Sequence, residues 1–162
     1  MKDHQTDFRM RAALPQDRAL LRALLDAHLD ELSGFAPVDR AYPWFDLYFS
    51  EPDRWAWLAE VDSAVAGFAL VNRHAASGLP AERVMAEFFV TRGFRRQGRG
   101  RRFAGSVFAA APGQWELSVL SANAPGLAFW LSVCGAYPAF QRIDAGEETI
   151  LRFVVASPSS AI

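Results

Sequence analysis

The stretch that most constrains the fold runs from Met85 to Phe103 and changes character twice. Residues 85–90 read MAEFFV, and their aromatic and β-branched content is typical of a half-buried strand. A loop with glycines at positions 93, 98 and 100 follows, and from about Gly100 the apolar residues return at helical spacing. The sequence therefore predicts a strand, a tight loop and a helix in direct succession.

The predicted loop has the features of an anion site. The start of a helix presents unpaired backbone N–H groups, and its dipole favours a negative charge there. Glycines at positions 98 and 100 remove side chains that would hold a phosphate away from the backbone. The chain has a formal net charge of −1, yet six arginines gather here: Arg92, Arg95, Arg96, Arg99, Arg101 and Arg102. We predict that a polyphosphate binds at this helix start.

The spacing of the glycines separates this loop from two common phosphate loops. A Walker A loop ends in Gly-Lys-Ser/Thr, and no lysine stands here. A dinucleotide fingerprint needs a third glycine where Phe103 stands. The pattern Arg95-x-x-Gly98-x-Gly100 instead resembles the acyl-CoA pyrophosphate loop, Arg/Gln-x-x-Gly-x-Gly/Ala, of the GNAT superfamily of acetyltransferases.

The order of the expected elements also resembles that superfamily. We expect strands at 8–13, 55–61, 64–71, 85–90, 115–120, 137–143 and 149–155, and helices at 14–33, at 44–49, from about 100 and from 123. The resemblance covers about residues 8–155. It implies one domain over 1–162 with the α/β (α+β) GNAT fold, a mixed and largely antiparallel twisted sheet of about seven strands flanked by about four helices.

A second motif supports the resemblance. Asn123-x-x-Gly126-x-x-Phe129-Trp130 is similar to the family's Asn-x-x-Ala-x-x-Phe-Tyr, which borders the pantetheine arm and the nucleotide. Taken together, the two motifs imply acetyl-CoA as co-substrate, and we expect no metal. The residues that they assign to its binding are Arg95, Arg96, Gln97, Gly98, Arg99, Gly100, Arg101, Asn123, Phe129 and Trp130.

The family also binds the pantetheine arm through backbone, between two parallel strands that separate. The resemblance places these strands at 87–90 and 115–120 of this chain. Backbone groups of Phe88, Phe89 and Val90 would then hold the arm, and a backbone N–H there would polarise the thioester carbonyl.

Acyl transfer to an amine needs a base, because an ammonium has no lone pair with which to attack. Glu87 is the candidate, since strand alternation puts it on the face opposite Phe88, where the family often has an acidic residue. The alternatives for Glu87 are a solvent-facing side chain and a core ion pair with an arginine.

The departing thiolate must take up a proton, and in this family a tyrosine usually donates it. The family's usual tyrosine is replaced by Trp130, whose indole N–H is not a usable acid near neutral pH. Tyr137 is the nearest tyrosine and the candidate donor, with a packed strand residue as the alternative.

His28 lies on the apolar stripe of the first helix, where we expect a buried neutral histidine rather than a catalytic one. We expect no acyl-enzyme on Cys134.

The acceptor should lie where the first two helices meet the central strand, and Glu31, Phe35, Trp44 and Tyr48 could line its site. We predict an N-acetyltransferase that acts by direct attack in a ternary complex on a small-molecule or peptide amine. One alternative is a non-catalytic acyl-CoA-binding regulatory module, favoured by the missing tyrosine. Another is a nucleotide- or RNA-binding domain, which the near-neutral charge disfavours.

The composition limits the setting in which the chain works. A hydrophobic content of 51% and a length of 162 residues predict one folded domain. A net charge of −1 argues against nucleic acid or an anionic membrane as partner. With one cysteine, no signal-like start and no long apolar run, we expect a soluble, cytoplasmic protein without an internal disulfide. The sequence is compatible with a homodimer.

Overall fold

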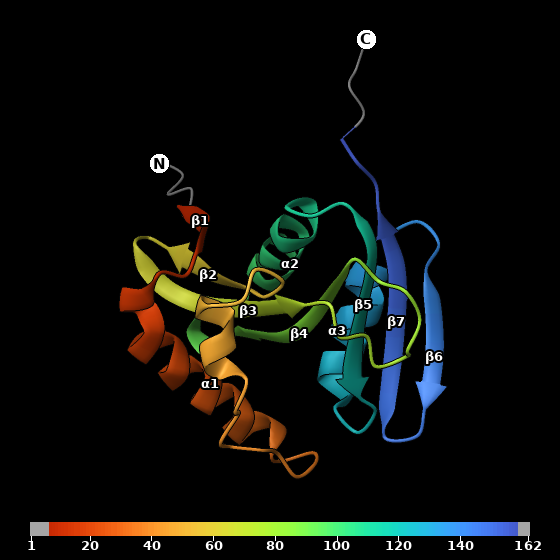
Figure 1. The fold of residues 1–162 in the computed structure, drawn as a ribbon, viewed down its shortest axis with the longest axis horizontal. Coiled ribbons are helices and arrows are strands. Elements are labelled where there is room, and N and C mark those ends of the chain that lie inside the picture. The colour runs from red at the N-terminus through yellow and green to blue at the C-terminus, as the bar shows by residue number, and fades with distance from the viewer. Residues whose placement is uncertain (1–6, 159–162) are drawn as a thin grey trace.

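A computed structural model describes residues 7–158 of the chain. The described residues form a seven-stranded sheet in the order β1-β2-β3-β4-β5-β7-β6 (Figure 1). The strands are β1 (Phe8–Ala12), β2 (Trp55–Val61), β3 (Ala64–Asn72), β4 (Arg83–Val90), β5 (Gly113–Leu120), β6 (Gln141–Ala145) and β7 (Glu148–Val155). The helices are α1 (Arg18–Leu32), α2 (Arg99–Ala109) and α3 (Ala124–Cys134), with the 3₁₀ turns η1 (Pro15–Asp17), η2 (Phe45–Phe49) and η3 (Arg92–Phe94).

The predicted sheet is confirmed, with two differences in the elements around it. Only β4 and β5 pair in parallel, and the other neighbours are antiparallel. The described residues contain three α-helices rather than about four, because the expected second helix is the 3₁₀ turn η2. Pro43 and Pro52 bracket η2 and leave room for little more than a turn.

The predicted strand at 137–143 has the wrong bounds. Residues Tyr137–Phe140 form the turn that leaves α3, and β6 begins only at Gln141. Pro138 cannot donate to a strand ladder, and Ala139 has a left-handed backbone with φ 56°. Both features prevent residues 137–140 from joining the strand, so β6 begins at Gln141.

The two faces of the sheet have separate cores. Leu21, Leu25 and Leu29 of α1 pack with η2 against Phe68, Leu70 and Phe89 on one face. The helices α2 and α3 pack against the other face, where Phe103, Phe108 and Trp130 meet Trp115 and Phe153. Figure 1 shows this division, with α1 on one side of the sheet and α2 and α3 on the other.

The start of α1 is fixed to the edge of the sheet. Arg11 on β1 donates two hydrogen bonds to Asp17, at 2.7 and 2.9 Å, and a third to Glu60 on β2 at 2.6 Å. The Asp17 carboxylate also accepts the backbone N–H of Leu14, and these bonds, the Arg11 pair foremost, lower the pKa of Asp17 to about 2. The position of α1 over the sheet is therefore set at its first turn.

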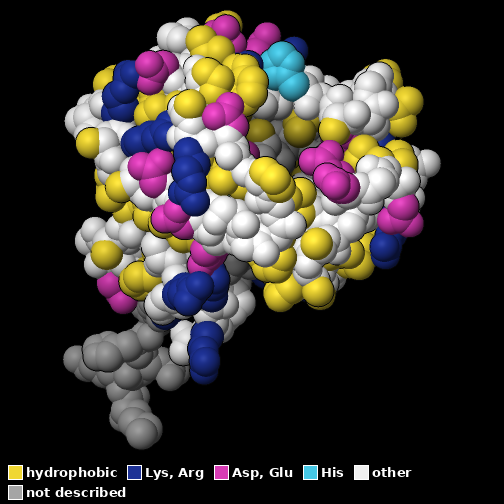
Figure 2. Space-filling model, turned by 90° about the horizontal axis from the view of Figure 1, so that it is seen from below, with side chains coloured by type: hydrophobic (Ala, Val, Ile, Leu, Met, Phe, Trp, Pro, Cys, Tyr) yellow, Lys and Arg dark blue, Asp and Glu magenta, His cyan; other side chains and the backbone are white. Residues whose placement is uncertain are grey.

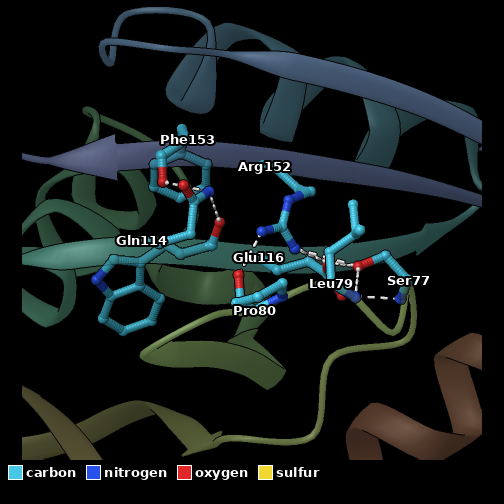
Figure 3. Close-up of polar contacts among 8 residues, drawn as sticks. Ser77, Leu79, Pro80, Gln114, Glu116, Arg152 and Phe153 are labelled. Carbon is cyan, nitrogen blue, oxygen red and sulfur yellow. Dashed lines mark hydrogen bonds and ion pairs between the residues drawn. The ribbon is translucent and has the colours of Figure 1, made fainter.

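The loop between β3 and β4 covers the face of β5 and β7 that no helix covers. Figure 3 shows a buried ion pair beneath it, in which Arg152 of β7 donates to Glu116 of β5 at 2.5 Å. Glu116 is fully buried and Arg152 is 5% exposed. Both groups also hold the loop, since Glu116 accepts from the backbone and side chain of Ser77, and Arg152 donates to the Pro80 carbonyl.

Every helix in residues 7–158 is too short or too polar to cross a lipid bilayer.

The buried pair generates a prediction about stability. Replacing Arg152 by methionine leaves the Glu116 charge buried without a cation, which should lower the free energy of unfolding by about 3–5 kcal/mol. Adding Glu116→Gln should recover part of that loss. Urea unfolding monitored by tryptophan fluorescence measures both changes.

The matched control is Arg142→Met on the exposed strand β6. Arg142 pairs with Asp144 at 3.0 Å, but both side chains are exposed, so the loss should stay below about 1 kcal/mol. Equal losses in the two single variants would show that burial of the Arg152 pair carries no special weight.

Candidate active site

The candidate active site lies where β4 and β5 separate. The two strands pair only at Arg83–Trp115, Val84–Glu116 and Met85–Leu117, while β4 stays paired with β3 up to Val90 and β5 stays paired with β7 up to Leu120. The edge of β4 that faces β5 is thus free of a strand partner from residue 86 to 90. Figure 2 views the molecule from this open end and shows a hollow with hydrophobic and acidic side chains on its rim.

A β-bulge at Ala86 decides which side chains face the two sides of β4. Leu70 of β3 lies opposite Glu87, and the next residue, Val71, lies opposite Met85, so Ala86 has no partner in the register. Met85 packs in the core under α2 and α3, whereas Glu87, two residues later, contacts α1 on the other face. An unbroken strand would have kept both on one face.

Glu87 sits in a small polar cluster on the α1 face. Its Oε2 lies 2.8 Å from Nε2 of His28 on α1, and its Oε1 accepts a hydrogen bond of 3.3 Å from the Tyr42 hydroxyl. The Glu87 side chain is 18% exposed. The expected opposition of Glu87 and Phe88 is confirmed, and the two alternatives for Glu87, free exposure and an arginine ion pair, do not describe it.

The next residue, Phe88, faces the opposite side and joins an aromatic cluster. Its ring lies 4.9 Å from Trp130, 5.2 Å from Phe103 and 6.0 Å from Phe129, measured between ring centroids. Trp130 is buried within this cluster. Asn123 caps α3 by accepting the backbone N–H of Gly126 at 3.1 Å, which fixes the helix that presents Phe129 and Trp130.

The predicted phosphate loop leads into α2 through two left-handed residues, Gln97 with φ 68° and Gly98 with φ 71°. Gly98 is the N-cap of α2, and no side chain caps the amides of the first turn. A Cβ at Gly98 would have no atom within 4 Å, so the space beside it is open. Uncapped amides beside open space at a helix start fit a phosphate.

The arginines of the loop differ in what they contact. Arg92 and Arg95 both pair with Glu31 of α1, at 3.0 and 2.6 Å, and Arg95 also donates to the Val90 carbonyl at 2.8 Å. Burial by itself would raise the pKa of Glu31, but the hydrogen bonds from Arg95 and Arg92 outweigh it and lower that pKa. Arg95 and Glu31 therefore brace the loop against α1.

The remaining arginines lie nearer to the start of α2. Arg101 donates to the Ser132 hydroxyl of α3, and Arg99 donates to the Gln97 side chain at 3.2 Å. Arg96 is exposed and makes no ion pair within residues 7–158. Its guanidinium is thus available to an anion at the helix start.

Tyr137 lies away from Glu87, in the turn after α3. Its ring packs against Phe108 and Phe153, with centroids 5.5 and 5.2 Å away, and burial raises its pKa. Cys134 is buried, and burial raises the pKa of its thiol to about 12. A buried thiol with a pKa raised in this way is a poor nucleophile near neutral pH.

A model of the "Acetyltransferase (GNAT) family" matches residues 19–136. This chain belongs to the GNAT acetyltransferase family. Among curated proteins, none matches it. The matched region contains β4, the loop and the start of α3, so the resemblance drawn from those residues is confirmed.

Solved structures share the GNAT fold with this chain. The PaiA N-acetyltransferase of Thermoplasma acidophilum in complex with coenzyme A has a TM-score of 0.65 at 14% identity, covering 91% of this chain and 99% of that chain. Diaminobutyrate acetyltransferase EctA of Paenibacillus lautus, bound to L-2,4-diaminobutyric acid and coenzyme A, has a TM-score of 0.65 at 15% identity, covering 93% and 96%. A GNAT acetyltransferase of Staphylococcus aureus Mu50 reaches 0.69 at 11% identity, covering 93% and 100%.

Two residues that contact Glu87, His28 and Tyr42, were not predicted as part of the candidate site. His28 was expected to be buried, and it is, but its contact with Glu87 could not be foreseen from a helix stripe. Tyr42 lies in an irregular segment with no hydrophobic period to indicate its direction. The one local signal is that Tyr42 precedes Pro43, since a following proline restricts the backbone conformation of the residue before it.

The bridge from α1 to the loop generates a prediction about local stability. Glu31→Ala removes the partner of Arg92 and Arg95, so amide hydrogens of residues 92–98 should exchange about tenfold faster, while those of the buried turns of α1 stay protected. Wild-type protein should lose the same protection as the pH falls through the lowered pKa of Glu31, because the protonated carboxyl cannot form the ion pairs.

The control for this prediction is Asp26→Ala. Asp26 is exposed and pairs with Arg22 within α1, so its loss should leave exchange in the loop unchanged. Equal exchange in the Glu31→Ala variant and wild type would mean that the loop is held by other contacts.

Proposed function

We propose that this GNAT chain transfers an acetyl group from acetyl-CoA to a primary amine by direct attack in a ternary complex. The observation that carries the proposal is the free edge of β4 beside the Glu87 carboxylate, with an open helix start at its C-terminal end. A free strand edge can pair with an extended ligand, and a helix start can hold its phosphates.

The chain offers a separate place to each part of acetyl-CoA. The uncapped amides of residues 99–101 would bind the pyrophosphate, and Arg96 would add charge. Backbone groups of Phe88 to Val90 would pair with the pantetheine arm, although Arg95 already occupies the Val90 carbonyl. Phe129 and Trp130 would border the arm from α3. Acetyl-CoA supplies an activated acyl thioester, which the β4 backbone would orient.

The acceptor would enter on the α1 face of β4. Glu87 takes a proton from the ammonium, the N–H bonding pair stays on nitrogen as its lone pair, and this nitrogen attacks the thioester carbon. The C–S bonding pair leaves with the CoA sulfur, which takes up a proton. The amine loses its second proton as the amide forms, so the products are the N-acetyl amine, CoA thiol and one proton.

The proton donor to the CoA sulfur differs from the family's usual tyrosine. Trp130 stands in that place and is packed among Phe88, Phe108 and Phe129, which suits it to line the cofactor rather than to transfer a proton. Tyr137 was the candidate donor, but its packing between Phe108 and Phe153 supports the structural alternative. We propose that solvent protonates the thiolate.

A small amine is the acceptor class that best fits the site. Diaminobutyrate acetyltransferase EctA of Paenibacillus lautus, which shares the fold, was solved with a diamino acid and coenzyme A, and this supports a small amine as the acceptor class. In this chain Tyr42 contacts Glu87, and the half-exposed ring of Trp44 packs edge-on against Tyr42 with centroids 5.8 Å apart. A carboxylate with aromatic side chains nearby suits an alkylammonium.

The phosphate loop is tested by Gly98→Asn. Asparagine tolerates the left-handed backbone at position 98 better than other side chains, so the fold should persist while the new side chain fills the open space at the start of α2. Affinity for acetyl-CoA, measured by calorimetry, should fall by at least about tenfold.

Gly78→Asn is the matched control, because Gly78 also has a left-handed φ of 73° and open space around it but lies in the β3–β4 loop. Its affinity for acetyl-CoA should equal that of wild type. Undiminished binding by the Gly98→Asn variant would place the pyrophosphate elsewhere.

The base is tested by Glu87→Gln. An amide cannot take the ammonium proton, so turnover with an amine found by screening should fall by about 10²-fold while acetyl-CoA affinity is kept. Glu147→Gln, an exposed turn residue, is the control and should behave as wild type. Acetyl-CoA binding by wild type without turnover on a broad amine panel would instead support a non-catalytic acyl-CoA-binding module.

A further inference from the structure

The two oxygens of the Glu87 carboxylate have different partners. Oε2 lies 2.8 Å from Nε2 of His28, a normal hydrogen-bond length, whereas Oε1 is bonded to Tyr42 at the longer distance of 3.3 Å. The side chains of both His28 and Glu87 are largely buried. Oε2 is therefore held by a hydrogen bond of normal length to helix α1, and Oε1 by a longer hydrogen bond to the segment between α1 and η2.

The ring of His28 is held by two aromatic side chains of the sheet as well as by Glu87. Its ring packs edge-on against Phe68, with centroids 5.9 Å apart, and against Phe89 at 5.6 Å. The helix α1 that carries it is anchored at its start by the Arg11–Asp17 bonds and at its end by Glu31 to the loop. A rigid ring aimed at Oε2 restricts the rotation of the carboxylate.

Tyr42 is held in a strained backbone conformation. Its φ is 41°, a left-handed value that is rare for a bulky residue and more so before a proline. Arg22 of α1 clamps the preceding turn by donating to the carbonyls of Arg40 and Ala41, and Arg40 pairs with Asp30. Strain that the surroundings maintain in this way is often found at functional sites.

The Tyr42 hydroxyl can act only as a donor toward Glu87. Burial, with the nearby Glu87 charge second, raises the pKa of Tyr42 far above its ordinary value, so the phenol stays protonated. Tyr42 is partly exposed and contacts the half-exposed Trp44, whereas His28 is buried, so Tyr42 lies on the solvent side of the cluster. Its bond to Oε1 is thus the one that an entering ligand can replace.

We propose that His28 is a positioning residue that fixes the Glu87 carboxylate through Oε2, and that Oε1, covered at rest by the Tyr42 hydroxyl, is the oxygen that receives the acceptor's proton. This inference rests on the proposed function for its kinetic consequences. The entering ammonium replaces the Tyr42 hydroxyl at Oε1, and its N–H proton passes to Oε1 while the bonding pair stays on nitrogen. His28 keeps its own proton throughout.

The proposal predicts unequal effects at the two partners of Glu87. His28→Ala frees the carboxylate to rotate, so kcat should fall about 10- to 100-fold with little change in the acceptor KM. His28→Gln, whose amide can donate to Oε2, should recover part of this loss. Tyr42→Phe removes only the resting partner of Oε1, so its loss of kcat should be clearly smaller than that of His28→Ala.

The kinetic outcomes that would overturn the proposal are specific. A loss of kcat in Tyr42→Phe as large as in His28→Ala would show that the hydroxyl takes part in the reaction. Equal losses in His28→Gln and His28→Ala would show that a donor to Oε2 is not what position 28 supplies. Calorimetry with acetyl-CoA on each variant separates these effects from loss of the fold.

A measurement without turnover tests the same contact. Nitrogen-15 spectra of histidine rings should show a proton on Nε2 of His28 that exchanges slowly in wild type and quickly in Glu87→Ala. The His28 signal is assigned by its absence in His28→Gln, and exposed His74 serves as internal control. An unprotonated Nε2 in wild type would overturn the proposal, whereas failure of wild type on all amines with this proton present would count against the proposed function alone.

Discussion

The structure depends on the separation of β4 from β5 after three parallel pairs. Each strand keeps its outer partner along its length, β3 for β4 and β7 for β5, so the gap opens between two well-paired halves of one sheet. The close approach of β3 to β4 is visible at Gly67, where any Cβ would lie 2.3 Å from the Phe89 carbonyl oxygen. Backbone groups that would complete a sheet elsewhere therefore have no strand partner on this edge of β4, and an edge of this kind can pair with an extended ligand.

The bulge at Ala86 turns this free edge into a two-sided site. Because it shifts the alternation of β4 by one residue, Glu87 faces the buried layer under α1 and Phe88 faces the aromatic layer under α2 and α3. Neighbouring residues of one strand thereby serve different sides, the proposed acceptor on one and the proposed cofactor on the other. Glu31 connects the helix on the acceptor side to the loop on the cofactor side, because its carboxylate on α1 pairs with Arg92 and Arg95 of the loop.

Much of the fold could be predicted because its signals are local. The strand at 85–90, the glycine loop and the helix after it follow from propensities and spacings within a few residues, and the family match confirms the motif they form. The burial of His28 followed from its place on a leucine stripe. Predictions failed where a local rule competed with proline or turn geometry, as at η2 and at the start of β6.

The sequence by itself predicted most of the elements, the glycine loop before α2 and the candidate base Glu87, because each of these signals lies within one continuous segment. Only the tertiary structure decided that His28 meets Glu87 from 59 residues away, that Tyr42 covers the second oxygen, and that Arg95 braces the loop. These contacts depend on the one-residue shift of the bulge and on the anchoring of α1 across the sheet. Periodicity within a segment carries no information about either, since both are set by the packing of distant segments.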